Sequence, residues 1–258
     1  MTRFSANLSI MFTEYDFMDR FEHAAKAGFK YVECMFPYSY EKKKILEKLK
    51  KYNLTQVLIN LPAGDWDAGE RGIAVIPGRE NEFRQGVKLA IEYAKALKIP
   101  CINCLVGLTP TNISAEKARK TIVANLRYAA EALERESLKL LVEALNTYDT
   151  PGFYLSNTNS VMSLLEEVGH QNIFFQYDVY HMQIMEGNLT NTIRKNITRI
   201  GHIQIADVPG RHEPGTGEIN FVNLLQFIDE AGYNDFIGCE YRPLTSTKEG
   251  LAWIKRCI

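Results

Sequence analysis

The chain has 258 residues, of which 46% are hydrophobic and 24% are charged, with 30 basic and 31 acidic side chains and a formal net charge of -1. This length fits one large α/β domain or two small domains. The balanced charge offers no basic surface to nucleic acid or to an anionic membrane, so we expect a small molecule as the partner. No apolar run reaches the roughly 18 to 20 residues that span a bilayer, and we therefore expect a cytoplasmic protein.

Short apolar runs alternate with longer segments of helical period along the whole chain, without a break in composition. This alternation is typical of strand–helix units in a parallel sheet. The apolar runs predict eight strands, at residues 4–9, 31–36, 55–61, 101–107, 139–145, 173–179, 200–207 and 236–241.

The segments between the predicted strands carry helix start and stop signals. Asp16 and Gly28 bracket one predicted helix, and Asn220 and Gly232 bracket another, because Asp and Asn cap helix starts and Gly favours helix ends. Apolar residues at helical spacing mark two more helices: Phe83, Val87, Ile91 and Ala94 in one, and Ile122, Leu126, Ala129 and Leu133 in the other.

Eight strand–helix units in about 250 residues predict a closed (β/α)8 TIM barrel, formed as a single domain by residues 1–258. The alternative is a doubly wound open sheet. That fold usually has a glycine-rich G-x-G-x-x-G turn after its first strand, and residues 7–13 lack it. We therefore favour the barrel and expect neither a nucleotide nor a flavin cofactor.

The five cysteines include one C-x-x-C pair, Cys101 and Cys104, which invites comparison with zinc or redox motifs. Both lie in a predicted strand, where residues three apart face opposite sides of the sheet, and no second pair completes a zinc site. We interpret four of the cysteines as buried reduced thiols in strands and the fifth, Cys257, as a terminal thiol.

Polar side chains interrupt four of the predicted apolar strands: Glu143, Asp178, Gln204 and Glu240. If they all point into the barrel mouth, three carboxylates converge, and two carboxylates about 4 Å apart repel by roughly 4 kcal/mol at an effective dielectric of 20. Structural ion pairs or neutral acids are the alternative explanation, but these strands offer few basic residues. An oxygen-rich set of this kind favours a hard divalent cation, Mg²⁺ or Mn²⁺.

Several segments, dispersed in order along nearly the whole chain, resemble the hydroxypyruvate isomerases. They include RFSANLS (3–9), NLPAGD (60–65), IPGRE (76–80), QYDVYH (176–181), HIQIAD (202–207), EPGTGEIN (213–220) and GCEY (238–241). This family lies within a wider group of xylose-isomerase-like barrels that includes ketose epimerases and apurinic-site endonucleases. The resemblance implies a metal-dependent isomerase that converts hydroxypyruvate to tartronate semialdehyde through an enediolate.

The resemblance also assigns roles to individual residues. Glu143, Asp178, Gln204 and Glu240 would be the metal ligands, and Glu143 and Glu240 would be the acid/base pair. The ketose epimerases usually have histidine where this chain has Gln204, which weakens the case for epimerisation of a free sugar. His181, just beyond a predicted strand end, matches a position that binds a substrate oxygen in the wider group.

A hydroxy-keto acid substrate also requires a cation for its carboxylate. Arg211 is our first choice, and Arg71 and Arg242 lie in comparable loops or strand ends. Arg71 and Arg211 fall in two long, glycine-rich connections, residues 61–78 and 208–218, which we expect to act as lids. We expect Trp66 to pack within its own loop and His202 to be a packed interior histidine.

Other functions remain open from the sequence. An isomerase of the longer 2-oxo-tetronate, or another sugar-acid isomerase or epimerase, would use the same site. A DNA-repair endonuclease would need a histidine cluster for zinc and a basic face, which five histidines and a charge of -1 do not favour. A sugar-acid-binding protein without catalysis is disfavoured by the intact acid pair. Apolar loop residues Phe36, Tyr38 and Tyr148 are compatible with a homo-oligomer.

Overall fold

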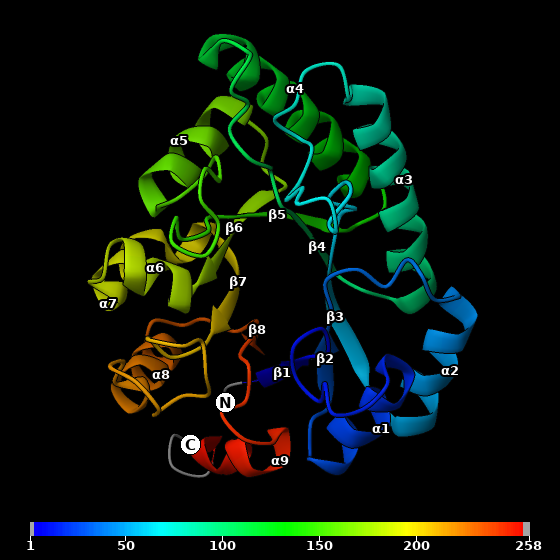
Figure 1. Ribbon diagram of the computed structural model, residues 1–258, viewed down its shortest axis with the longest axis vertical. Coiled ribbons are helices and arrows are strands. Elements are labelled where there is room, and N and C mark those ends of the chain that lie inside the picture. The colour runs from blue at the N-terminus through cyan, green and yellow to red at the C-terminus, as the bar shows by residue number, and fades with distance from the viewer. Residues whose placement is uncertain (1–2, 255–258) are drawn as a thin grey trace.

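The structure, a computed structural model, describes residues 3–254. Eight parallel strands follow one another around a closed barrel in the order of the sequence, and Figure 1 shows helices as an outer ring around them. The first and last strands pair with each other, Phe4 opposite Ile237 and Ala6 opposite Cys239. This pairing confirms the predicted (β/α)8 barrel and excludes the open sheet, which would leave both edge strands unpaired.

The strands begin within one residue of the predicted positions, but they end one to three residues earlier. Their bounds are β1 Arg3–Asn7, β2 Tyr31–Glu33, β3 Thr55–Asn60, β4 Cys101–Cys104, β5 Lys139–Glu143, β6 Ile173–Asp178, β7 Ile200–Ile205 and β8 Phe236–Cys239. The early ends correct our prediction, because strand pairing stops where the chains diverge into the loops of the barrel mouth. Glu240 consequently lies just beyond β8, where its backbone N–H still donates to the carbonyl of Ile205.

The described helices are α1 Phe17–Lys26, α2 Lys42–Tyr52, α3 Glu80–Leu97, α4 Ala115–Glu134, α5 Thr158–Val168, α6 Val179–Met185, α7 Leu189–Asn196, α8 Phe221–Glu230 and α9 Thr247–Gly250, with 3-10 turns η1 Ile197–Arg199 and η2 Leu251–Trp253. Asn220 caps α8 by accepting from the N–H of Asn223, as predicted. Asp16 precedes α1, but its side chain makes no capping hydrogen bond. None of the described helices is long and apolar enough to cross a membrane.

The barrel interior is apolar at one end and polar at the other. Near the strand starts, Val57, Leu58, Cys101 and Leu141 form a small inner cluster. Residues two positions further along a strand face the same side, which brings Glu143 above Leu141 at the mouth. The larger core lies between the outer faces of the strands and the helices. A rigid apolar base therefore supports a polar layer at the C-terminal end, where active sites of such barrels lie.

The cysteines behave as structural thiols in the part of the chain that the structure describes. Cys101 belongs to the inner cluster and Cys104 to the outer core, so the two face opposite ways. Cys34, Cys101, Cys104 and Cys239 are all buried and free, and burial raises the pKa of Cys101 and Cys104 to about 12. The interpretation as buried thiols is confirmed for these four, while Cys257 lies outside the described residues.

Candidate active site

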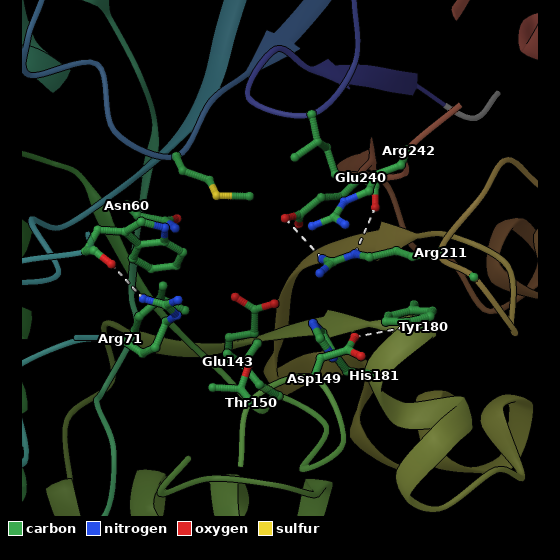
Figure 2. A pocket seen from close by; sticks show the side chains of 16 residues that line it. Asn60, Arg71, Glu143, Asp149, Thr150, Tyr180, His181, Arg211, Glu240 and Arg242 are labelled. Atoms are coloured by element: carbon green, nitrogen blue, oxygen red, sulfur yellow. Dashed lines mark hydrogen bonds and ion pairs between the residues drawn. The ribbon is translucent and has the colours of Figure 1, made fainter. Parts of the chain in front are cut away.

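A cavity of about 640 Å³ opens at the C-terminal mouth of the barrel. Its lining includes the predicted residues Glu143, Glu240, His181 and Arg211. Figure 2 shows the carboxylates of Glu143 and Glu240 directed toward the same part of the pocket from two different strand ends. The cavity therefore brings together side chains that lie far apart in the sequence.

Glu143, the last residue of β5, is buried and has only neutral partners among the described residues. Its Oε2 accepts from Asn103 Nδ2 at 2.9 Å and from Gln176 Nε2 at 3.0 Å. Burial, followed by repulsion from Glu240 and Asp178, raises the pKa of Glu143 well above its ordinary value. The amides orient this carboxyl group without supplying a charge to balance it.

Asp178 and Glu240 share one cation. Nη2 of Arg211 lies 3.3 Å from Oδ2 of Asp178 and 3.2 Å from Oε1 of Glu240. Burial nevertheless raises the pKa of Asp178, and it raises the pKa of Glu240 to about 8, with Arg211 opposing the shift in both cases. The sequence had suggested that the strands lack cations for these acids, and the structure supplies one from a loop instead.

The acids outnumber the cation beside them. Glu143, Asp178 and Glu240 carry three negative charges when ionised and Arg211 carries one positive charge, which leaves a formal charge of -2. One oxygen each of Glu143 and Asp178 and a ring nitrogen of His181 lie within 4.8 Å of one another. A divalent cation would balance this charge, and carboxylate oxygens suit a hard ion. The donor set therefore fits such a metal.

His181 is a neutral hydrogen-bond donor to the pocket. Its Nδ1 accepts from the backbone N–H of Asn146 at 3.1 Å and lies 2.8 Å from Asn146 Nδ2. Because a backbone N–H can only donate, Nδ1 is unprotonated, and the ring proton belongs to Nε2. Burial, assisted by Arg211, holds the pKa of His181 well below its usual range. The Nε2–H points toward Asp178, whose Oδ2 lies 3.6 Å away.

Gln204 lies deeper than the other predicted ligands. Its Oε1 accepts from Gln176 Nε2 at 2.7 Å, which links it through Gln176 to Glu143. Its Nε2 donates to Glu33 Oε1 at 2.8 Å. A second, much smaller cavity reaches Gln204 and Gln176 and is also lined by Glu143 and Glu240. Three of the four predicted ligands, Glu143, Gln204 and Glu240, thus line this smaller cavity, whereas Asp178 lines neither cavity and lies beside Glu143 and Arg211.

Glu33, in β2, is the central residue of this deeper layer, and our sequence analysis missed it. Its carboxylate accepts from Ser5 Oγ at 2.7 Å, Asn7 Nδ2 at 3.3 Å, His202 Nε2 at 3.0 Å and Gln204. Burial opposes ionisation, but the charge of His202 and these donors lower the pKa of Glu33 overall. An acid within the apolar run YVEC (31–34) was the available signal. His202 is an interior histidine, as predicted.

Carboxylates tie together both of the predicted lid loops, through a buried aspartate in the loop after β7 and through a partly exposed ion-pair network in the loop after β3. After β7, Asp207 accepts from the backbone N–H groups of Val208, Gly215, Gly217 and Ile219, which fixes the loop that carries Arg211. After β3, a network of Glu70, Arg79 and Glu82 ties together the loop that carries Arg71. Residues of both loops line the cavity at the mouth, among them Arg71 and Arg211.

Most of the aromatic side chains at the mouth that we singled out from the sequence pack against other residues of the chain. Trp66 stacks on Arg71 of its own loop, as predicted, but it also packs against Phe36 in the loop after β2, with ring centroids 5.1 Å apart, and it lines the pocket. Tyr38 donates to the carbonyl of Asn60 and packs against Tyr93. Tyr148, with 79% of its surface exposed, is the only one of the three residues considered for an oligomer contact that remains largely free.

Comparisons with known proteins agree with this architecture. A family model described as a xylose isomerase-like TIM barrel matches residues 21–257. The chain is 55% identical to hydroxypyruvate isomerase from Escherichia coli, over 98% of each chain, and 44% identical to a 2-oxo-tetronate isomerase from Cupriavidus necator, over 99% of this chain and 98% of that one. A crystal structure titled AP endonuclease, family 2, from Brucella melitensis superposes with a TM-score of 0.97 at 44% identity, covering 99% of both chains.

Proposed function

Because the chain belongs to the hydroxypyruvate isomerase family of xylose isomerase-like TIM barrels and is a sugar-acid isomerase, we propose that it interconverts hydroxypyruvate and tartronate semialdehyde. The observation that carries the proposal is the pair of buried glutamates, Glu143 and Glu240, on two sides of one cavity. The 55% identity to a hydroxypyruvate isomerase supports the three-carbon substrate.

We propose that Glu143, Asp178, Gln204 and Glu240 hold a divalent cation, Mg²⁺ or Mn²⁺. The charge deficit of the three acids supports this assignment, as does the oxygen chemistry of the set. When bound, such an ion polarises a substrate carbonyl and stabilises the charge of an enediolate. Glu33 accepts from the Gln204 amide nitrogen, which leaves the amide oxygen for the side of Glu143 and the cation.

The two glutamates would move the carbon-bound proton. One removes a proton from the hydroxymethyl carbon of hydroxypyruvate, and the other delivers a proton to the neighbouring former carbonyl carbon. The hydroxyl oxygen loses its proton as it becomes the aldehyde oxygen, and the former carbonyl oxygen gains one, so no atom or electron is lost. Burial raises the pKa of Glu143 well above its ordinary value and that of Glu240 to about 8. This supports such exchange, because a carboxyl group with a raised pKa holds a proton more readily than an ordinary carboxylate does.

His181 and Arg211 would bind the reacting part of the substrate. The Nε2–H of His181 is a neutral donor for a substrate oxygen, and Asn146 fixes its ring. Because Nδ1 accepts from Asn146 and the ring proton is therefore on Nε2, the nitrogen that faces the pocket has no free lone pair for a metal, and we assign His181 to the substrate. Arg211 lies between Asp178 and Glu240, where its guanidinium reaches both acids and the substrate bound beside them.

A four-carbon 2-oxo-tetronate is the second candidate substrate. The 44% identity to a 2-oxo-tetronate isomerase favours it, and a cavity of about 640 Å³ is larger than a three-carbon acid requires. The same acids would perform the same proton transfers on the longer acid. Substrate preference therefore depends on the walls of the pocket and not on the reacting groups.

A small-molecule enzyme is better supported than a DNA-repair endonuclease. Of the described histidines, only His181 lines the main cavity, and His202 is committed to Glu33. A cluster of zinc ions would need more histidine ligands. We propose a hydroxy-keto acid as the partner and the cytoplasm as the location, where buried thiols such as Cys34 and Cys239 stay reduced.

The test follows proton exchange and product formation by NMR in D2O. Chelator-treated protein is given hydroxypyruvate or 2-oxo-tetronate, each with and without added Mg²⁺ or Mn²⁺. We expect metal-dependent formation of tartronate semialdehyde with deuterium incorporated at carbon. Faster conversion of the four-carbon acid would assign the second substrate instead, and no exchange with either acid under any metal condition would contradict the enediolate mechanism.

A further inference from the structure

Three arginines line the cavity, and they differ in whether their guanidinium group is already paired with an acidic side chain. Arg211 contacts Asp178 and Glu240. Arg71 and Arg242 also line the cavity, and neither makes an ion pair with an acid among the described residues. A substrate carboxylate binds best to a guanidinium whose charge and donors are still available. Arg211, our first choice from the sequence for the substrate carboxylate, is therefore set aside because it is paired with two acids, and the choice is between Arg71 and Arg242.

The guanidinium of Arg71 is held in place by neutral groups. Its Nη1 donates to the backbone carbonyls of Trp66 at 3.0 Å and Glu70 at 2.7 Å. Its Cζ lies 4.0 Å from the ring centroid of Trp66, a stacked arrangement. Both interactions leave the full positive charge in place. No described residue accepts a hydrogen bond from Nη2 or Nε, and this pair of donors can bind a planar carboxylate through two hydrogen bonds.

The neighbouring acid that could neutralise Arg71 is directed elsewhere. The carboxylate of Glu70 pairs with Arg79 and accepts from the backbone N–H of Asp65. Glu82 contacts the other side of Arg79, so two acids surround that arginine. The loop thus contains its own ion pairs while its one arginine in the cavity lining has none.

The backbone beside Arg71 is fixed by close packing. Gly72 has φ +118°, and a Cβ at this position would overlap the carbonyl oxygen of Leu105 in the next loop. The Gly72 N–H also donates to the carbonyl of Ala63 at 2.8 Å. Arg71 is therefore presented to the cavity from a rigid support, which limits the loss of conformational entropy when a ligand binds.

Arg242 lacks such support. Its side chain is exposed, and its described hydrogen bonds involve only its backbone, which contacts Arg211 and His212. Figure 2 shows Arg71 on the opposite side of the pocket from Arg211, with Glu143 between them, whereas Arg242 lies beside Glu240. A carboxylate at Arg71 would thus extend away from the acids, while one at Arg242 would approach Glu240 and be repelled.

We propose that Arg71, stacked on Trp66, binds the carboxylate of the 2-oxo acid substrate, opposite the acid cluster and Arg211. This inference rests on the proposed function, since it assumes that the substrate is an acid whose other end reaches Glu143 and Glu240. It makes the loop after β3 a determinant of specificity for acids over neutral hydroxyketones.

The test compares Arg71→Gln with the matched control Arg242→Gln, on hydroxypyruvate and on dihydroxyacetone, which has the same carbon number but no carboxylate. We expect Arg71→Gln to raise KM for hydroxypyruvate about 10- to 100-fold, the usual effect of losing a charge-assisted hydrogen bond, with a much smaller change in kcat. Arg242→Gln should raise KM less than threefold, and any turnover of dihydroxyacetone should be unchanged in both variants. If Arg71→Gln raised KM for dihydroxyacetone as much as it raised KM for hydroxypyruvate, the loop would be generally damaged and the proposal would be overturned.

A binding measurement separates this inference from the proposed function. Pyruvate has the 2-oxo acid group but no hydroxyl on its terminal carbon, so it serves as a probe that the proposed reaction does not convert. We expect pyruvate to change the fluorescence of Trp66 in the wild type and to bind about 10- to 100-fold more weakly to Arg71→Gln. If Arg71→Gln binds pyruvate more weakly and no isomerisation is found, the carboxylate site is supported and the proposed function is contradicted. If hydroxypyruvate is isomerised and Arg71→Gln leaves KM unchanged, the proposed function is supported and the carboxylate site at Arg71 is contradicted.

Discussion

Buried carboxylates occur in two layers of the same barrel, and their surroundings push their pKa values in opposite directions. At the mouth, Glu143 and Glu240 are buried with too few cations, and burial raises both pKa values. In the deeper layer, Glu33 is fully buried as well, yet four donors and the charge of His202 lower its pKa.

This contrast separates acids that hold the structure together from acids that are available for chemistry. Burial alone disfavours a charged carboxylate, and the donors around it decide whether ionisation is restored. Glu33 has its acceptor sites filled, so it is a fixed anion that orients Ser5, His202 and Gln204. Glu143 and Glu240 retain unfilled acceptor capacity facing a cavity, which a cation, a substrate or a proton can occupy.

We expect the largest effect, a loss of activity, from substitution of the two glutamates at the mouth. Glu143→Gln and Glu240→Gln keep the side-chain shape but remove the group that exchanges a proton. We expect each to lower kcat for isomerisation about 10²- to 10⁴-fold. The melting temperature of the metal-free protein should stay the same or rise, because each change removes repulsion among buried acids. Steady-state kinetics and thermal melts with a chelator measure both quantities.

Glu116→Gln controls for the replacement of a carboxylate by an amide, because Glu116 is an exposed residue of α4 whose described ion pair is with the exposed Lys120. It should alter neither the activity nor the melting temperature. If Glu143→Gln or Glu240→Gln lost activity only in proportion to a loss of folded protein, these acids would be structural and the distinction between the two layers would fail.

The same substitution in the deeper layer, Glu33→Gln, should mainly lower the stability of the fold. Glu33→Gln replaces an acceptor-only group with an amide, so at least one of the donors from Ser5, His202 and Gln204 loses its partner. We expect the free energy of unfolding to fall by about 1 to 3 kcal/mol, measured by urea denaturation. We also expect weaker Mn²⁺ binding by calorimetry, because the Gln204 amide is then free to turn its nitrogen toward the mouth.

Ser5→Ala is the control for this second effect, since it removes one donor to Glu33 and leaves the Gln204 contact in place. It should cost some stability and leave Mn²⁺ affinity close to that of the wild type. Unchanged Mn²⁺ affinity in Glu33→Gln would show that Glu33 has a structural role only.

The smallest expected effect is a pH dependence of stability in the metal-free protein. A carboxyl group whose pKa is raised on folding binds its proton more tightly in the folded state, so its stabilising effect is lost as pH rises from its ordinary pKa of 4.5 to the folded value, about 8 for Glu240. We expect the melting temperature to fall by several degrees between pH 6 and pH 8.5, and by less in Glu240→Gln.

Adding Mn²⁺ should reverse this slope, because the cation binds the deprotonated acids and is favoured at higher pH. Calorimetry in two buffers with different ionisation enthalpies would detect the protons that are released on binding. A metal-free melting temperature that rises over this pH range, in both the wild type and Glu240→Gln, would mean that the mouth acids are ionised without a metal.

Local patterns in the sequence were sufficient for the fold and for much of the site. Apolar runs with helical segments between them predicted the eight strands and their order, since each pattern depends on residues close together in the chain. Glu143 and Asp178 were visible because an acid interrupts an apolar strand. The same reasoning applied to the run at 31–34 would have identified Glu33, but it would not have shown that Glu33 is satisfied.

Periodicity and the cost of burying charge are local properties of the chain, and they were enough to predict the barrel, the strand starts and the acids at the mouth. The partner of each charged group could be read only from the folded chain. Glu33 meets His202, 169 positions away in the chain, and Arg211 reaches Asp178 and Glu240 from a loop. Arg71 remains available because Glu70 pairs with Arg79. Such pairings depend on loop conformation and on barrel closure, and no pattern of neighbouring residues encodes them.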